Sequence, residues 1–141
     1  MKTKKMLAIV VGLALLGGII LFVVIQLIPY GKDHSNPPVV QEPTWDAETR
    51  AIAQKACFDC HSNEVVWPWY SNIAPVSWLI QHDVEEGRQH LNFSNWTGHD
   101  SHEVGEVVAE GEMPPPYYVL MHPNAKLTQA EKQTLMQAFG R

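Results

Sequence analysis

Two cysteines separated by two residues and followed directly by a histidine are the most informative part of this 141-residue sequence. The segment is Cys57-Phe-Asp-Cys-His61, and the chain contains no other cysteine. The spacing C-x-x-C-H is typical of c-type haem attachment. Two thiols on a short helical turn can each form a thioether with one haem vinyl group, and the adjacent histidine can ligate the iron. We therefore expect Cys57, Cys60 and His61 to hold one covalent haem c, with His61 as the proximal ligand.

Two other kinds of site use the same cysteine pair. A thioredoxin-like redox site also contains C-x-x-C, but it occurs beside a βαβ pattern, which this sequence lacks. A zinc site would add two histidines at spacings such as H-x₃₋₅-H. His99 and His102 have only two residues between them, one fewer than that spacing requires. Haem attachment is the favoured interpretation, and the zinc and redox sites remain alternatives.

A methionine in a proline-rich segment is the leading candidate for the second iron ligand. Met113 precedes three prolines, which keep the chain extended and can fix a sulfur atom at the iron. Methionine opposite histidine raises the reduction potential of a haem. The competing interpretation is a methionine that only fills the core. Met121 and His122 are further candidates for the iron.

The N-terminus predicts a membrane anchor. Lys2, Lys4 and Lys5 form a short basic tail over residues 1–5, and an apolar segment over residues 6–29 follows. About 23 residues at about 1.5 Å each give roughly 34 Å, enough to cross a bilayer core. The segment lacks the small-residue cleavage site of a signal peptide, so we expect an uncleaved signal anchor. The lysines should stay in the cytoplasm, which places the rest of the chain outside the inner membrane of a bacterium, in the periplasm.

The charge distribution limits the kinds of partner. All fifteen acidic residues lie after position 30, together with seven of the ten basic ones, so this part carries a net charge of −8 with histidine neutral. Such a surface is unsuited to nucleic acid and favours a redox protein with a basic docking face. No pattern for a small-molecule substrate is evident.

The remaining chain predicts a tether and one small all-α domain. Residues 30–43 contain three prolines and no apolar period, which is typical of a semi-extended linker. Residues 44–141 have no strand-like alternation and show capping and helical-period signals instead. Four short helices are expected: from Ala47 into Cys57 with Thr44 or Asp46 as the cap, from Pro75 past Val84, from the capping box of Asp100 and Glu103 to Gly111, and from Thr128 to Gly140.

Several sequence segments resemble the bacterial single-haem "haem-binding domain" family, whose members carry one C-x-x-C-H motif. The likeness extends from Thr44 to Gly140. It rests on Cys57-Phe-Asp-Cys-His-Ser-Asn, Trp67-Pro-Trp-Tyr, Ile73-Ala-Pro-Val-Ser-Trp, Gly111-Glu-Met-Pro-Pro-Pro-Tyr and His122-Pro-Asn-Ala-Lys-Leu-Thr. The chain is more distantly similar to small class I cytochromes c, whose core lacks the Trp67–Trp78 insert. The resemblance implies covalent haem at Cys57 and Cys60, with His61 and Met113 on the iron.

The tryptophan-rich insert suggests how a haem could be covered. Indole rings bury apolar area efficiently, and their N–H groups can reach a propionate. We expect at least one tryptophan to contact the haem, and Arg88 is a candidate propionate partner. The acidic residues near Met113 could form a docking face, although a solvated helix flank is the favoured interpretation. These residues are Glu103, Glu106, Glu110 and Glu112.

The favoured function is electron transfer by a membrane-anchored monohaem c-type cytochrome, not an enzyme. In this class the haem supplies the chemistry, and the protein supplies ligation, burial and a docking surface. One alternative is a haem enzyme or gas sensor with a labile sixth ligand. Another is an accessory subunit of a respiratory membrane complex, whose anchor packs through small residues spaced four apart. These small residues are Ala8, Gly12, Ala14 and Gly18.

Overall fold

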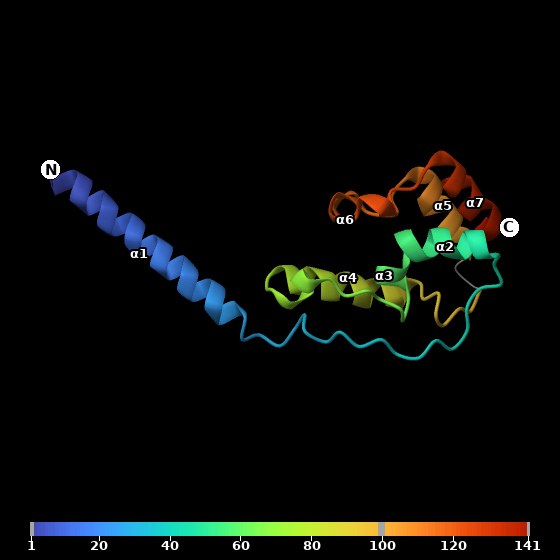
Figure 1. Cartoon of the computed structure of the whole chain (residues 1–141), viewed down its shortest axis with the longest axis horizontal. Helices are drawn as coiled ribbons and strands as arrows, with labels where there is room; N and C mark the ends of the chain where they lie inside the picture. The colour runs from blue at the N-terminus through green and yellow to red at the C-terminus, as the bar shows by residue number, and fades with distance from the viewer. Residues whose placement is uncertain (1, 99–100, 141) are drawn as a thin grey trace. The chain divides into compact units, whose positions relative to one another are not determined.

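The computed structural model describes residues 2–98 and 101–140, and their regular structure is entirely helical (Figure 1). The prediction of an all-α domain after an N-terminal apolar helix is confirmed. The α-helices are α1 (Lys2–Ile25), α2 (Ala47–Ala56), α3 (Phe58–His61), α4 (Val76–His90), α5 (Ser101–Glu110), α6 (Pro116–Met121) and α7 (Gln129–Phe139). Two 3₁₀ helices, η1 (Trp69–Asn72) and η2 (Pro123–Ala125), complete the order.

The four helices expected after the anchor correspond to α2, α4, α5 and α7. Asp46, and not Thr44, caps α2, since its carboxylate accepts the Thr49 amide at 2.7 Å. Thr128 and Glu131 form the expected capping box at the start of α7. The capping box expected at Asp100 lies outside the described residues. Two further short helices border the cavity described below: α3 contains the helical turn expected at the C-x-x-C-H segment, and α6 was not expected.

The chain divides into two compact units, and α4 contributes to both. One unit combines the N-terminal part up to His34 with Pro68–His82, and the other combines Ser35–Trp67 with the chain from Asp83 onward. The boundaries expected from the sequence, a linker over residues 30–43 and a domain over residues 44–141, stay predictions.

Helix α1 is long and apolar enough to cross a membrane, and none of its residues is buried. The chain leaves the helix at Gln26, whose side-chain amide pairs with both backbone groups of Ala74. The N-terminal segment is thereby joined to Pro68–His82 within the first unit.

The core of the second unit is built around a stack of aromatic rings. Phe58 and Phe93 are each 1% exposed, and their ring centroids lie 5.9 Å apart. Trp45 stacks on Phe58 at 5.8 Å, and Trp96 stacks on Phe93 at 5.8 Å. Helices α5 and α7 pack against each other over this stack, with Val108, Leu135 and Phe139 buried between them. Because Phe58 belongs to the C-x-x-C-H segment, this core anchors the motif directly.

Candidate functional site

The tight junction between α2 and α3 positions the C-x-x-C-H segment. Cys57 ends α2, where its amide donates to the carbonyl of Ala53 at 2.8 Å, and it also precedes the first residue of α3. The amides of Cys60 and His61 then both donate to the carbonyl of Cys57, at 3.1 and 2.9 Å. This turn directs Phe58 into the core and brings both cysteines and His61 to the wall of one cavity.

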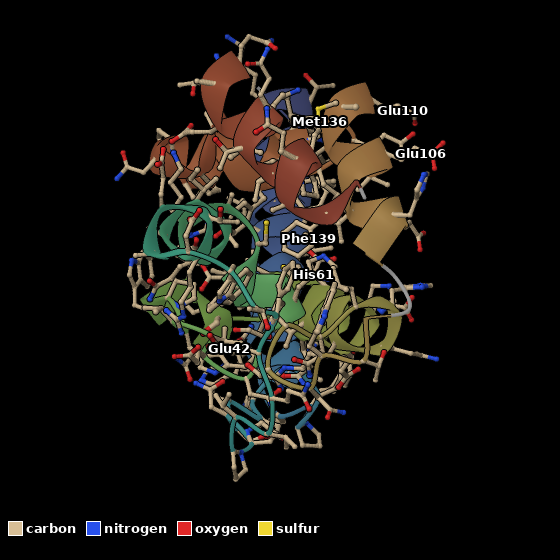
Figure 2. All side chains as sticks on the ribbon, turned by 90° about the vertical axis from the view of Figure 1, so that its right-hand side faces the viewer. Glu42, His61, Glu106, Glu110, Met136 and Phe139 are labelled. Carbon is tan, nitrogen blue, oxygen red and sulfur yellow. The ribbon has the colours of Figure 1, made fainter. Side chains whose placement is uncertain are left out.

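His61 is oriented by two backbone carbonyls. Its Nδ1 lies 2.9 Å from the carbonyl oxygen of Gly87 and 3.1 Å from that of Leu91. Because a carbonyl can only accept, Nδ1 carries the proton and the neutral ring keeps a lone pair on Nε2. Burial lowers the pKa of His61, which favours this neutral form. A metal-binding histidine usually has this arrangement, with one nitrogen donating to the protein and the other left for the metal. Figure 2 places His61 near the middle of the second unit.

The cavity in front of His61 has a volume of about 400 Å³ and lies entirely within the second unit. This volume is within the range of roughly 300–1,000 Å³ found for small-molecule and cofactor sites. Its walls are mainly apolar and come from α2, α3, α4, α5, α6 and the proline-rich segment before α6. The apolar lining residues include Leu91, Phe93, Val104, Val107, Val108, Pro114 and Pro115.

Both cysteine thiols are held in the protonated state. Burial raises the pKa of Cys57 and of Cys60 to about 12, and the carboxylates of Asp83 and Asp59 add to the effect at Cys60. Reactive redox thiols have the opposite environment, one that lowers the thiol pKa. The redox alternative therefore finds no support in this geometry.

The zinc alternative would need further metal ligands beside the two cysteines. Among residues 2–98 and 101–140, no group of three or more Cys, His, Asp or Glu side chains is arranged to hold a metal ion. His99, one of the two histidines considered for that alternative, lies outside the described residues.

Met113 lines the same cavity as His61, at the position set by the end of α5. Gly111 adopts a φ of +79°, and the amide of Glu112 donates to the carbonyl of Val107 at 3.0 Å. With the bond from the Gly111 amide to the carbonyl of Val108 at 3.2 Å, this completes a Schellman motif. The turn reverses the chain and delivers Met113 to the cavity.

The two other candidates for the second ligand lie outside the cavity lining. Met121 is 59% exposed. His122 stacks on Tyr118 with ring centroids 4.3 Å apart, and its Nδ1 lies 3.2 Å from the carbonyl of Tyr118. Of these three candidates, Met113 is the one that lines the cavity.

Tyrosines line the cavity where tryptophans were expected. Among the described residues no tryptophan lines it, and its two tyrosines are Tyr117 and Tyr118 on α6. The Tyr118 hydroxyl donates to the Asp59 carboxylate at 2.7 Å, and the Tyr117 hydroxyl donates to Asp83 at 3.2 Å. Two consecutive tyrosines directly after a proline run are the feature of the sequence that could have indicated this lining.

Arg88 donates to backbone carbonyls on two other segments of the second unit. Its Nε donates to the carbonyl of Ser62 at 2.8 Å, and its terminal nitrogens lie 3.3 and 3.4 Å from the carbonyl of Ser35. The guanidinium group therefore holds the segment around Ser35 against the chain that follows His61. Arg88 is absent from the cavity lining, so its contact with a propionate stays a prediction.

Carboxylates border the cavity on several sides. Asp83 and Glu86 come from α4, Glu103 comes from α5, and Glu112 follows the Schellman turn. Within the described residues, no lysine or arginine lines the cavity. By contrast, Figure 2 shows Glu106 and Glu110 on the outer side of α5. The acidic group near Met113 is therefore divided between the cavity border and a solvated helix flank.

An all-helical unit in which two cysteines, a histidine with a free Nε2 and a methionine face one mainly apolar cavity has the architecture of a small haem-binding protein. These residues fit a haem group. The cavity has the size of a cofactor site, its walls are mainly apolar, and both nitrogen and sulfur donors face it. The chain belongs to the haem-binding domain family, whose model matches residues 20–140. Haem is therefore the cofactor of this protein. No curated protein and no solved structure matches the chain.

Proposed function

We propose that this protein is a membrane-anchored monohaem c-type cytochrome that carries single electrons on the extracytoplasmic side of a bacterial inner membrane. The observation that carries the proposal is the meeting of Cys57, Cys60, His61 and Met113 on one cavity. Thiols for covalent attachment and two axial ligands of different chemistry are the parts that such a carrier needs.

Each of these residues has a distinct role in the proposal. Cys57 and Cys60 would hold the macrocycle through thioether bonds, and Nε2 of His61 and the sulfur of Met113 would ligate the iron. Haem supplies the one-electron chemistry when it is bound, and the apolar walls exclude water from it. The hydrogen bonds from His61 to the carbonyls of Gly87 and Leu91 fix the ring and increase the basicity of Nε2.

Helix α1 supports the anchoring part of the proposal. The basic tail would stay in the cytoplasm, and the remainder would lie in the periplasm. The family match begins at residue 20, within α1, so the C-terminal part of this helix belongs to the matched region. Gln26, the first residue after α1, is paired with Ala74. Both observations favour a helix that stays attached over one that is removed.

The carboxylates that border the cavity support the partner part of the proposal. Asp83, Glu86, Glu103 and Glu112 line the site, and the lining within residues 2–98 and 101–140 includes no lysine or arginine. A redox protein with a basic docking face would be attracted to this side, and salt would weaken the encounter.

Covalent attachment is tested by haem retention after denaturation. The full chain is produced with a c-type maturation system, separated by denaturing electrophoresis and stained for haem, and its mass is determined. We expect haem to stay with the chain, at one per molecule. The double variant Cys57→Ala/Cys60→Ala should lose the stain, whereas Met136→Ala should keep it. Haem that leaves the wild-type chain on denaturation would overturn the c-type assignment.

A further inference from the structure

We propose that Pro68–His82 forms a juxtamembrane collar, a segment fixed to the end of α1 whose exposed apolar side chains lie in the interfacial layer of the lipid bilayer. The inference rests on the membrane anchoring proposed above. It assigns to the tryptophan-rich insert a lipid-binding role in place of the expected haem contact.

The collar is joined to the anchor by a paired hydrogen bond. The Gln26 side-chain amide donates to the Ala74 carbonyl at 3.0 Å, and its oxygen accepts the Ala74 amide at 2.9 Å. This satisfies both backbone groups of Ala74, which is fully buried.

Two further contacts hold the collar against the residues that follow α1. Gly31 adopts a φ of +84°, and a Cβ there would come within 2.6 Å of the Ser77 carbonyl carbon, so only glycine allows this approach. His34 Nε2 lies 3.2 Å from the carbonyl oxygen of Ser71. The collar is thus fixed at three points within nine residues of the helix end.

The position of Gln26 sets the depth of the collar. Twenty residues from Met6 to Ile25 separate the basic tail from Gln26, and at about 1.5 Å each they span about 30 Å, the thickness of a bilayer hydrocarbon core. Gln26 therefore lies at the outer boundary of the hydrocarbon when α1 spans the membrane. Ala74, bonded to Gln26, lies at the same boundary.

Burial within the collar is inverted relative to an ordinary water-soluble segment. The small residues Ser71, Ala74 and Ser77 are at most 1% exposed. Large apolar side chains alternate with them and remain accessible: Trp69 is 77% exposed, Ile73 37%, Val76 45% and Leu79 50%. An exposed apolar surface of this kind indicates an interaction site.

The composition of the collar fits lipid better than a charged protein partner. Pro68–His82 contains no Asp, Glu, Lys or Arg, although the chain from residue 31 onward carries 22 such residues. Trp69 and Tyr70 are the residue types enriched where a membrane meets water. Because the collar is continuous with the anchor and uncharged, the occupant of its exposed side is the lipid interface.

The test measures the depth of single nitroxide labels on the full-length holoprotein in phosphatidylcholine and phosphatidylglycerol vesicles. Labels are placed by Ile73→Cys, Val76→Cys and Leu79→Cys. Ile20→Cys within α1 is the lipid reference, and Glu48→Cys on the exposed side of α2 is the aqueous reference. The wild-type chain is the labelling blank, because both native cysteines should be held as thioethers. The collision rate of each label is measured with oxygen and with a water-soluble nickel chelate, and a sample under nitrogen gas is the baseline for both.

We expect the three collar labels to have oxygen-to-nickel collision ratios several-fold above that of Glu48→Cys and below that of Ile20→Cys. Ratios equal to that of Glu48→Cys would overturn the collar while leaving the anchor intact. Low collision with both reagents would mean that protein covers this side, which also contradicts the proposal. A label at Ile20→Cys that is as accessible to nickel as the one at Glu48→Cys would reject the anchor and the collar together. Incorporation of the nitroxide into the wild-type chain would reject haem attachment alone.

Discussion

The carbonyl oxygen of Gly87 lies 2.9 Å from Nδ1 of His61, and this hydrogen bond joins α4 to the C-x-x-C-H segment. The same glycine allows the two elements to approach, because a Cβ at Gly87 would collide with the carbonyl oxygen of Cys60 and lie 2.9 Å from its carbonyl carbon. Gly87 therefore orients His61 through its carbonyl, and its lack of a side chain lets α4 approach the C-x-x-C-H segment closely.

Gly87→Ala should destabilise the holoprotein by roughly 1–3 kcal/mol, the usual cost of overpacking a close contact. The added methyl group must push α4 away from Cys60 and lengthen the bond to His61. Urea unfolding followed by circular dichroism measures the change. Gln89→Ala, on the exposed side of the same helix, should leave the unfolding midpoint unchanged. A Gly87→Ala protein as stable as the wild type would mean that α4 does not press on the motif.

Met113→Ala should lower the reduction potential on the order of 0.1 V, a part of the roughly 0.8 V range over which axial ligands tune haem proteins. The physical reason is the loss of the Met113 sulfur as an iron ligand, since a methionine ligand stabilises the ferrous state. Redox titration of the purified protein measures the shift. Met136→Ala is a matched control, since Met136 is 38% exposed and Met113 36%, and Met136 is absent from the cavity lining. Equal potentials for the two variants would remove Met113 from the iron.

Tyr118→Phe should lower the free energy of unfolding by about 1–2 kcal/mol, because its hydroxyl donates a 2.7 Å charge-assisted hydrogen bond to Asp59. Burial raises the pKa of Tyr118, so the hydroxyl stays protonated through the ordinary pH range. Tyr117→Phe provides the comparison, since its 3.2 Å bond to Asp83 is exposed and should contribute less than about 0.5 kcal/mol. Denaturant titration of both variants checks the difference, and equal losses would contradict the dominant role given to Tyr118.

Glu42 should make the protein sensitive to acid. The Arg50 guanidinium beside it lowers the pKa of the Glu42 carboxyl below its usual value. A lowered folded-state pKa gives stability that is present above the unfolded pKa of about 4.3 and is lost as the pH falls through the folded value. The Glu42→Gln variant should therefore be less stable than the wild type at pH 7. On acidification to about pH 3 its free energy of unfolding should fall by less than that of the wild type.

The measurement for Glu42 is the urea midpoint at both pH values. Glu106→Gln, on the exposed flank of α5 seen in Figure 2, is the control. Its stability should fall on acidification by as much as that of the wild type. If Glu42→Gln lost as much stability on acidification as the wild type, the Arg50 pair would not be the source of the sensitivity.

Local patterns predicted the elements that carry local signals. Thr128 and Glu131 specify a helix start through bonds within four residues, and that capping box is present. The C-x-x-C-H spacing likewise places two thiols and an imidazole on one turn. Helix α6 has only six residues, which is too short to show a period, so its part in the site was not foreseen.

Long-range contacts decided the features that sequence reasoning missed. Arg88 has the hydrogen-bonding capacity for a propionate, and Ser62 and Ser35, 26 and 53 residues away, provide acceptors for it in the structure. A tryptophan in the sequence indicates a large apolar side chain but does not indicate which surface that side chain packs against. Trp69 is exposed in the first unit, whereas Trp45 packs on Phe58 in the core of the second.

The most direct test of the central claim is an optical spectrum of the purified full-length protein, oxidised, reduced, and reduced with carbon monoxide. With Met113 and His61 on the iron, the oxidised protein should be low-spin and show the weak far-red band of methionine ligation. The reduced spectrum should not change with carbon monoxide. A high-spin spectrum that shifts when carbon monoxide is added would contradict six-coordinate electron transfer and favour a haem enzyme or gas sensor.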